Sequence, residues 1–211
     1  MKRQIHNFIT AILSGLCISL GCVAFLKVGG IVGACLFTFG LLTVVHYGWR
    51  LYTGTAGFVG FSDFRESVGS LLFLVWVFIG NLIGCYLTNL SLADTVPILA
   101  ENASKIVDGR LSTGPLGCMM LAMMCGFIMT TAVEFARKGK MLPLLLGVPV
   151  FILCGFAHSI ADAFYFLVSP AEQLLQTEVF IVYVSEVLGN FVGCNLYRWM
   201  LVFEPKEDKK C

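Results

Sequence analysis

The sequence has little charge. Only 13% of its 211 residues are Asp, Glu, Lys or Arg, whereas 58% are hydrophobic. The mean hydropathy of +0.87 lies far outside the range expected of a soluble domain of this length. A soluble globular domain is therefore excluded, and the formal net charge of +1 gives no sign of a nucleic-acid partner.

Motifs for metal binding and disulfide formation are also missing. The three histidines, His6, His46 and His158, fall on different segments without an HxxxH or HExxH pattern. Nine cysteines are present, but no two have CxxC spacing, and eight lie in apolar runs where a small side chain allows helices to pack closely. We therefore expect no metal, no cofactor and no enzymatic activity.

The chain instead contains long apolar runs. Each of five uncharged runs is long enough to cross a hydrocarbon core, which needs about 20 residues of helix, and a weaker sixth run follows them. The six runs are 3–27, 27–50, 66–94, 110–134, 140–162 and 178–203. The first is too long for the apolar part of a signal peptide and has no A-x-A site, so we interpret it as a span. The sequence thus predicts an all-α membrane protein with six transmembrane helices in a single channel domain, 1–211.

The basic residues predict how these helices are oriented. Three of them fall on one side of the membrane, namely Lys27, Lys105 and Arg110. Eleven fall on the other side: Lys2, Arg3, Arg50, Arg65, Arg137, Lys138, Lys140, Arg198, Lys206, Lys209 and Lys210. Because cytoplasmic loops carry the excess of Lys and Arg, we expect both termini to be cytoplasmic in a cell inner membrane.

A short internal repeat indicates how the domain is built. GNLIGC at 80–85 returns as GNFVGC at 189–194, in the third and sixth predicted spans. We therefore expect two copies of a three-span unit, about 1–92 and 111–204, followed by a short cytoplasmic tail, 205–211. Because three is odd, the second copy enters the membrane from the opposite side, which makes the repeat inverted and is typical of channels and transporters.

The second span of each copy is rich in glycine and proline. The segment 29–55, GGIVGACLFTFGLLTVVHYGWRLYTGT, and the segment 141–162, MLPLLLGVPVFILCGFAHSIAD, are the second and fifth spans. Such residues interrupt helical hydrogen bonds, and the freed backbone groups are tolerated at membrane depth only in protein or around a cavity. We expect both helices to be broken at a solute path, with half-helix N-termini that suit an anion.

Five motifs in their order and spacing resemble the formate/nitrite transporter family. They are LYTGT (51–55), the two GN motifs, MMCGFIMTTAVEF (123–135) and GFAHSIAD (155–162), and together they cover nearly the whole chain. The resemblance implies a pentamer of aquaporin-like protomers. It also implies transport of small monovalent anions such as formate, nitrite, hydrosulfide or short carboxylates, either passively or with a proton.

The resemblance also implies roles for individual residues. By position, His158 is the central pore histidine and faces Thr53, and Arg110 lies at the outer mouth. Apolar constrictions on either side of the histidine match Phe37 and Leu41, just before and at the first break, and Phe151, just before the second.

The chemistry of an imidazole supports such a mechanism. A bare anion is costly to move past apolar side chains, whereas a neutral acid is much less so. An imidazole with an unperturbed pKa near 6.5 can exchange a proton in the physiological range, and the Thr53 hydroxyl could orient the solute or the ring. Two alternatives stay open: a channel for a small neutral solute with His158 as a hydrogen-bonding filter, and a membrane subunit without a pore.

The sequence departs from the family pattern at several positions. Ala157 and Arg50 replace acidic residues, Asp162 and Gly126 replace asparagines, and Glu186 has no family counterpart that we can name. We expect Glu186 to lie near the outer interface. The segment before the first span is short for the family, so we expect no gating role for it.

The two unexpected charges near the breaks need partners. An unpaired charge at this depth is costly, so we expect Asp162 to pair either with Arg50 or with His158, which lies four residues away on one helix face. Alternatively, Arg50 extends its side chain to the cytoplasmic surface.

Overall fold

The computed structural model describes residues 2–59, 64–92 and 96–201, and the predicted tail 205–211 lies outside them. In the described residues the regular structure is entirely helical. The helices are α1 (Lys2–Val28), α2 (Gly30–His46), α3 (Tyr52–Ala56), α4 (Phe64–Leu92), α5 (Ile98–Arg137), α6 (Leu142–Leu153), α7 (Ser159–Val168), α8 (Ala171–Leu174) and α9 (Thr177–Leu201).

Two of the six spans are interrupted, as predicted. Helices α1, α4, α5 and α9 are long and apolar enough to cross a membrane unaided. The second span consists of α2 and α3, and the fifth consists of α6 and α7. Gly48 and Gly155 lie in the two breaks with φ angles of 65° and 69°, a left-handed conformation that side chains disfavour. These glycines allow the chain to turn out of one half-helix and into the next.

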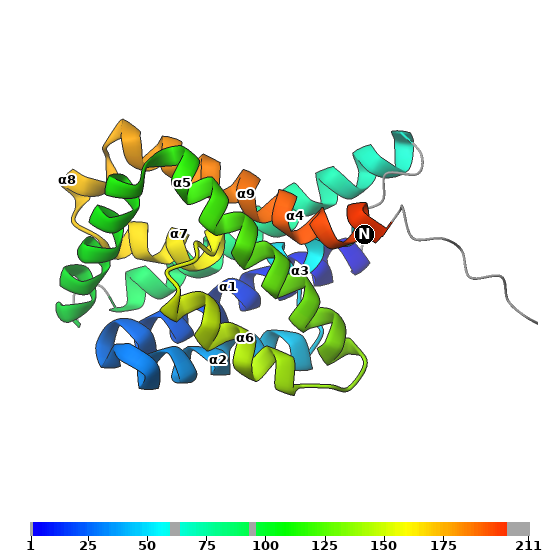
Figure 1. The fold of residues 1–211 in the computed structure, drawn as a ribbon, viewed down its shortest axis with the longest axis horizontal. Coiled ribbons are helices and arrows are strands. Elements are labelled where there is room, and N and C mark those ends of the chain that lie inside the picture. The colour runs from blue at the N-terminus through cyan, green and yellow to red at the C-terminus, as the bar shows by residue number, and fades with distance from the viewer. Residues whose placement is uncertain (1, 60–63, 93–95, 202–211) are drawn as a thin grey trace, which may run out of the picture.

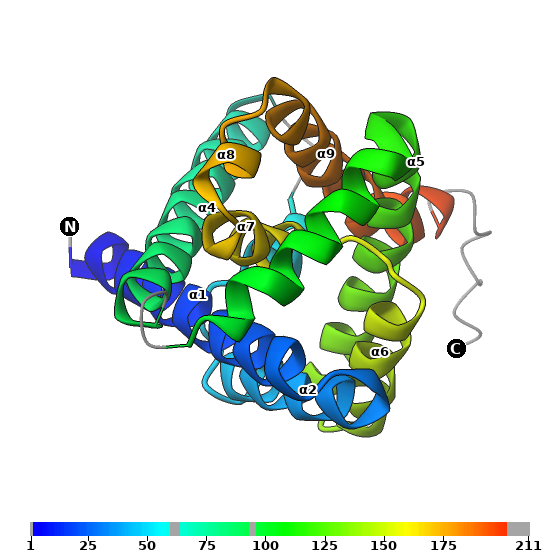
Figure 2. The ribbon, with the colours of Figure 1, turned by 90° about the vertical axis from the view of Figure 1, so that its left-hand side faces the viewer.

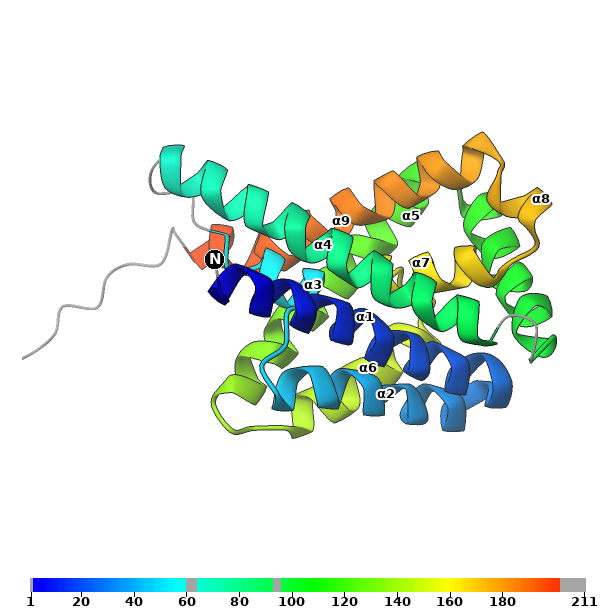
Figure 3. The same ribbon diagram turned by 180° about the vertical axis from the view of Figure 1, so that it is seen from behind.

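The helices surround a central short helix. Seen end on, α7 lies near the middle, and the long helices and the α2 and α6 half-helices lie around it (Figure 2). The start of α1 and the end of α9 lie at one end of the molecule, whereas α8 lies at the other (Figures 1 and 3). We call the end with α8 the outer end and the opposite end the inner end.

Helix α5 is bent sharply near its middle. Gly114 has a φ of 73°, outside the helical region, and Pro115 follows it. The residues before the bend lie across the outer end, and those after it run along the molecule (Figure 1). A helix before residue 110 was not predicted, because that segment carries Glu101 and Lys105, which pair at 2.8 Å on its exposed face.

The glycines of the repeated motif allow helices to approach closely. A side chain on Gly84 would collide with the carbonyl oxygen of Ile12 in α1, and one on Gly193 would collide with that of Met123 in α5. Both repeats therefore use the same small-residue contact between their first and third spans.

The asparagine of each motif holds a break in place. In the first repeat, Asn81 accepts a hydrogen bond from the Tyr52 N–H (2.8 Å) and donates to the carbonyl oxygens of Ala11 (2.8 Å) and Arg50 (2.9 Å). The buried asparagine thereby satisfies backbone groups that the interrupted helix leaves without partners.

In the second repeat, Asn190 repeats this arrangement. It accepts from the Ser159 N–H (2.8 Å) and donates to the carbonyl oxygens of Ala122 (2.8 Å) and Ala157 (2.9 Å). Tyr52 and Ser159 are therefore structural counterparts, which sets the register between the two breaks.

Candidate functional site

His158 ends the second break and caps α7. Its Nδ1 accepts a hydrogen bond from the Ala161 N–H at 3.2 Å, and its Nε2 lies 3.0 Å from the Thr53 Oγ1 on α3. Only 2% of His158 and 1% of Thr53 are exposed. The structure thus brings the predicted histidine and threonine together, one from each broken helix, deep inside the protein.

The hydrogen bonds of His158 define its tautomer. Because Nδ1 accepts a backbone N–H, it carries no proton in this arrangement, and a neutral ring must carry its proton on Nε2. The Nε2–H therefore donates toward the Thr53 hydroxyl. The ring presents a hydrogen-bond donor on the side facing α3 and uses its other nitrogen to fix its orientation.

Two phenylalanines lie next to this histidine. The Phe151 ring stacks on the His158 ring with centroids 5.6 Å apart, and Phe37 meets Phe151 edge to face at 5.8 Å. Both phenylalanines are buried, as is Leu41. Phe151 lies just before its break, as predicted, but Phe37 and Leu41 lie within α2 rather than at its end, because α2 continues to His46.

An outer cavity of about 380 Å³ reaches His158. Its lining includes Phe25, Arg110, Phe151, His158 and Asp162. We call this cavity the outer vestibule, since it lies between α7 and the first part of α5.

A smaller cavity of about 80 Å³ lies on the other side of the Phe37–Phe151 pair, which we call the constriction. Its lining includes Leu41, Trp49, Arg50, Leu51 and Arg137, and we call it the inner vestibule. Among the described residues, none lines both cavities. The Phe37–Phe151 pair and the His158–Thr53 contact come from the helices that lie between the two vestibules.

The two vestibules are built from equivalent positions. Leu51 precedes α3 as His158 precedes α7, and each is followed by the residue whose N–H binds the repeat asparagine. Leu51 lines the inner vestibule, whereas His158 lines the outer one. The repeat therefore duplicates the scaffold, but at this position only the second copy carries a titratable side chain, His158.

Asp162 pairs with Arg110, so both predicted pairings were wrong. The Arg110 Nε lies 2.9 Å from the Asp162 Oδ2, and the Arg110 Nη2 lies 3.4 Å from its Oδ1. Arg110 also donates to the carbonyl oxygens of Gly155 (2.6 Å) and Phe156 (3.4 Å) in the second break. The guanidinium reaches these groups because the bend in α5 folds its first part over the outer end.

Glu186 belongs to the same cluster, although we expected it near the outer interface. Its side chain is fully buried, and its Oε1 lies 3.5 Å from the Arg110 Nε. Neither of its carboxylate oxygens has a hydrogen-bond partner among the described residues. The sequence signal for this residue was an acid in an apolar helix without a visible partner.

The inner vestibule carries arginines in a different setting. The Arg50 Nε donates to the Asn7 Oδ1 at 3.2 Å, and its guanidinium lies 5.9 Å from the Phe73 ring centroid. Arg137 contacts the carbonyl oxygen of Gly54 at 3.4 Å and lies 4.0 Å above the Phe58 ring. Within the part of the chain that the structure describes, neither arginine forms an ion pair with a carboxylate.

Two further departures have different structural settings. A side chain on Gly126 would collide with the backbone at Asn190, so the glycine allows α5 and α9 to pack closely. Ala157 is fully buried, and its carbonyl oxygen accepts a hydrogen bond from the Asn190 side chain. Its own side chain is a methyl group, so this position carries no acid. Nothing in the structure explains why alanine replaced an acid there.

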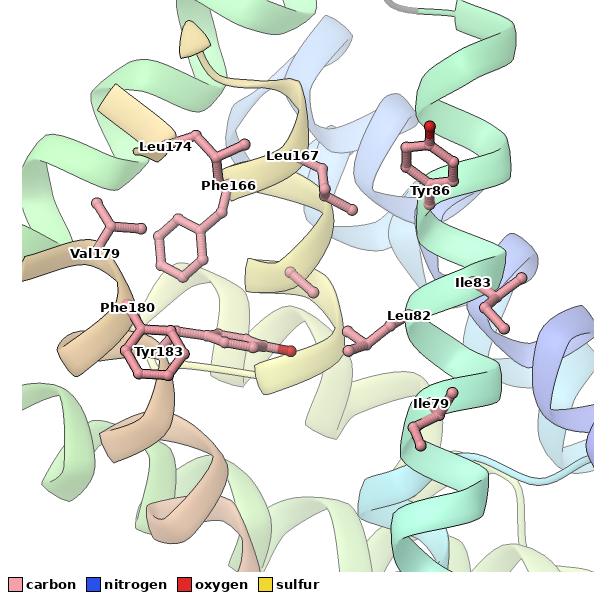
Figure 4. A pocket seen from close by; sticks show the side chains of 11 residues that line it. Ile79, Leu82, Ile83, Tyr86, Phe166, Leu167, Leu174, Val179, Phe180 and Tyr183 are labelled. Atoms are coloured by element: carbon pink, nitrogen blue, oxygen red, sulfur yellow. The ribbon is translucent and has the colours of Figure 1, made fainter. Parts of the chain in front are cut away.

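A larger, apolar groove of about 420 Å³ lies between α4, α7 and α9 (Figure 4). Its lining includes Leu82, Phe166 and Tyr183, and no charged side chain belongs to it. A charged solute would lose its hydration there without gaining a partner. The groove is therefore a poor candidate for an anion site.

Across the described residues, no group of three or more His, Cys, Asp or Glu side chains could hold a metal ion.

Comparison with known sequences identifies a family. The model of a family described as formate/nitrite transporter matches residues 2–203. A curated relative, the uncharacterized transporter YrhG of Bacillus subtilis (strain 168), is 25% identical over an alignment of 181 residues that covers 79% of this chain and 66% of that protein. The matched region thus spans slightly less than two thirds of this relative.

Comparison with solved structures supports the fold. A solved structure described as "Pentameric formate channel with formate bound" is 24% identical, with a TM-score of 0.79 over 95% of this chain and 96% of that one. Another, described as "FNT family ion channel", is 17% identical, with a TM-score of 0.77 over 93% and 90%. The family match confirms an integral membrane protein of a transport family rather than an enzyme, and the solved structures confirm its fold. The chain belongs to the formate/nitrite transporter family and has its aquaporin-like, inverted-repeat fold.

Proposed function

We propose that this chain transports small monovalent weak-acid anions, such as formate, nitrite, hydrosulfide or short carboxylates, and that His158 exchanges a proton with the solute. The observation that carries this proposal is the buried His158–Thr53 contact at 3.0 Å, which lies between two vestibules lined by arginines. The formate bound to the similar pentameric channel supports this class of solute.

The constriction favours a neutral solute. Phe37 and Phe151 offer only ring edges and faces, so an ion that passes between them loses water without gaining a partner. A weak acid that has taken up a proton avoids this cost. The solute can therefore be an anion in both vestibules and a neutral acid at the constriction.

His158 can exchange a proton if its cap opens. A second proton must bind Nδ1, which accepts the Ala161 N–H in the neutral ring. Losing a side-chain helix cap costs about 0.5–2 kcal/mol, so the ring can leave this bond reversibly. The cationic ring then gives the Nε2 proton to the anion, which leaves a neutral imidazole and a neutral acid.

A second candidate function is a channel for a small neutral solute. The fixed Nε2–H donor of His158 favours it, because a hydrogen-bonding filter needs an oriented donor and no change of protonation. Liposome swelling measures neutral-solute entry, and anion flux measures the first function. Swelling with a neutral solute but no anion flux would favour the second candidate.

We also propose that the protein is a pentamer in the cytoplasmic membrane with both termini in the cytoplasm, built as repeat halves of about 1–92 and 111–204. The start of α1 and the end of α9 lie at the same end (Figure 1), where Arg50 and Arg137 line the inner vestibule. This placement agrees with the bias of basic residues toward the cytoplasm. The pentameric assembly of the similar formate channel supports the pentamer.

The proposed function can be tested by flux into proteoliposomes. We expect uptake of formate, nitrite, hydrosulfide and acetate to rise as the pH falls, because more solute and imidazole carry a proton. His158→Ala should remove this flux, whereas the exposed His46 offers a matched control in His46→Ala. An unchanged pH profile in His158→Ala would contradict the role of this histidine.

A further inference from the structure

We propose that Asp162 and Glu186 hold one proton between them beside Arg110, and that this buried site resupplies the proton that His158 gives to the solute. The first half of this proposal stands on the geometry of the cluster. The second half rests on the proposed transport of weak-acid anions.

The two acids share one cation. The Arg110 Nε lies 2.9 Å from the Asp162 Oδ2 and 3.5 Å from the Glu186 Oε1, so the two carboxyl groups are also close to each other. The exposed fractions of the three side chains are 11% for Arg110, 1% for Asp162 and 0% for Glu186. Water therefore screens this cluster poorly.

The charges of the cluster balance only with one proton. If both acids were ionised, one guanidinium would face two buried carboxylates, and the excess negative charge would be costly in this environment. Two carboxyl groups that lie this close also repel each other when both are ionised. One bound proton makes the cluster neutral overall.

The hydrogen bonds indicate where the proton resides. Asp162 receives two contacts from Arg110, as an ionised carboxylate requires. Both Glu186 oxygens are buried without a hydrogen-bond partner in the described part of the chain. An ionised Glu186 would leave these acceptors unsatisfied, whereas a protonated one carries no charge and gains an O–H donor.

The thiols and phenols around the cluster are neutral at pH 7 by their ordinary chemistry, and the imidazole of His158 is the one further neighbour that can gain a charge near this pH. Figure 4 shows one of them, Tyr183, with its hydroxyl directed away from α9 toward Leu82. These groups are thiols, phenols and one imidazole: Cys22 on α1, Cys118 and Cys125 on α5, His158 and Tyr165 beside or on α7, and Tyr183 on α9. Among the described residues, Arg110 is the only cation that acts on the two acids.

The proton has a route to His158. Asp162 and Arg110 line the outer vestibule together with His158, whereas Glu186 lies behind them. In the proposed step, the Glu186 O–H bond breaks, its proton passes through Asp162 to His158, and an N–H bond forms at the Nδ1 that the open cap frees. The cationic ring then gives its Nε2 proton to the weak-acid anion. Both acids are then ionised beside Arg110, and a hydronium ion from the outer solution restores the proton.

Infrared spectroscopy of the purified full-length protein tests the proton site without any transport. At neutral pH we expect the C=O band of a protonated carboxyl group, and Glu186→Gln should remove it. Glu178→Gln, at the exposed start of α9, is the matched control and should leave the band unchanged. A missing band in the natural protein, or a band that survives in Glu186→Gln, would overturn the proposal.

Asp162→Asn separates a shared proton from one held by Glu186 alone. Without Asp162, Glu186 becomes the only acid beside Arg110, so it should ionise and the band should disappear although Glu186 is still present. A band that persists in Asp162→Asn would overturn the sharing of the proton.

Flux measurements then test the use of this proton. In Glu186→Gln we expect formate uptake from the outer side to fall severalfold at neutral pH and to recover at acidic pH, where the solute brings its own proton. A wild-type pH profile in this variant would overturn the second half of the proposal. A band without any anion flux in the natural protein would overturn the proposed function and leave the proton site in place.

Discussion

The outer and inner vestibules occupy equivalent places in the two repeats, but their arginines differ in whether acidic side chains contact them. In the outer vestibule, Arg110 contacts two buried acids. In the inner vestibule, Arg50 and Arg137 form no ion pair with any carboxylate that the structure describes. An anion therefore meets an arginine paired with acids on one side, and on the other two arginines that have no acidic partner among the described residues.

A comparison of the two repeat halves shows which structural features they share. Asn81 and Asn190 make the same three hydrogen bonds, so the support of each break is retained. The side chains just beyond these hydrogen bonds differ. The third residue after Tyr52 is Thr55, whereas the third residue after Ser159 is Asp162. Each of these two side chains lines a cavity, which leaves room for this change in the scaffold.

The largest expected effect comes from removing the outer arginine. Arg110→Met leaves two buried acids without a cation, and breaking a buried ion pair costs about 3–5 kcal/mol of unfolding free energy. Arg137→Met in the inner vestibule is the matched change and should cost about 1 kcal/mol or less, because this side chain is exposed and forms no ion pair with a carboxylate that the structure describes. Denaturation in detergent would measure both.

A triple variant checks the cause of that loss. Arg110→Met combined with Asp162→Asn and Glu186→Gln removes the uncompensated charge, so it should recover most of the stability. Equal losses in Arg110→Met and Arg137→Met would contradict the contrast between the vestibules.

An intermediate effect is expected from the asparagines that hold the breaks. Asn81→Ala and Asn190→Ala each lose three hydrogen bonds, worth about 2–4 kcal/mol in total at roughly 1 kcal/mol each. The loss should be smaller for Asn190→Ala, because Arg110 also binds the carbonyl oxygens of Gly155 and Phe156 in that break. Hydrogen exchange of the Tyr52 and Ser159 amides would report each break, and faster exchange at Ser159 in Asn190→Ala than at Tyr52 in Asn81→Ala would argue against this second clamp.

The smallest expected effect concerns capture of the anion at the inner end. Arg50→Gln removes a partly exposed positive charge, which should lower formate flux from the inner side about two- to fivefold, and less at high salt. The exposed Lys140 gives a control in Lys140→Gln. Equal effects of the two changes would mean that Arg50 acts only through the overall charge of that end.

The fold could largely be predicted because its signals are local. Segments dense in glycine and proline predicted both breaks, which contain Gly48 and Gly155, and the GNxxGC motif occurs twice with its packing role intact. The facing of His158 and Thr53 was implied by the resemblance of GFAHSIAD and LYTGT to motifs of the family, and the structure brings the two side chains together. Phe37 and Leu41 were placed at the break because no local signal fixes where α2 ends.

The pairing of charges could not be predicted, because it depends on contacts between distant segments. Arg110 and Asp162 are separated by 52 residues, and they meet only because the bend at Gly114 turns the first part of α5 across the outer end. The pairings expected from the sequence relied on spacing along one helix or across the breaks. Glu186 likewise acquires its partner from α5 rather than from its own helix.

The central claim is that the solute crosses the constriction as a neutral acid. The most direct test is to impose a formate gradient on proteoliposomes and record anion uptake, internal pH and membrane potential together. We predict that one proton enters with each formate, so the lumen acidifies in step with uptake and no potential develops. Uptake that generates a negative internal potential without matching acidification would contradict this claim.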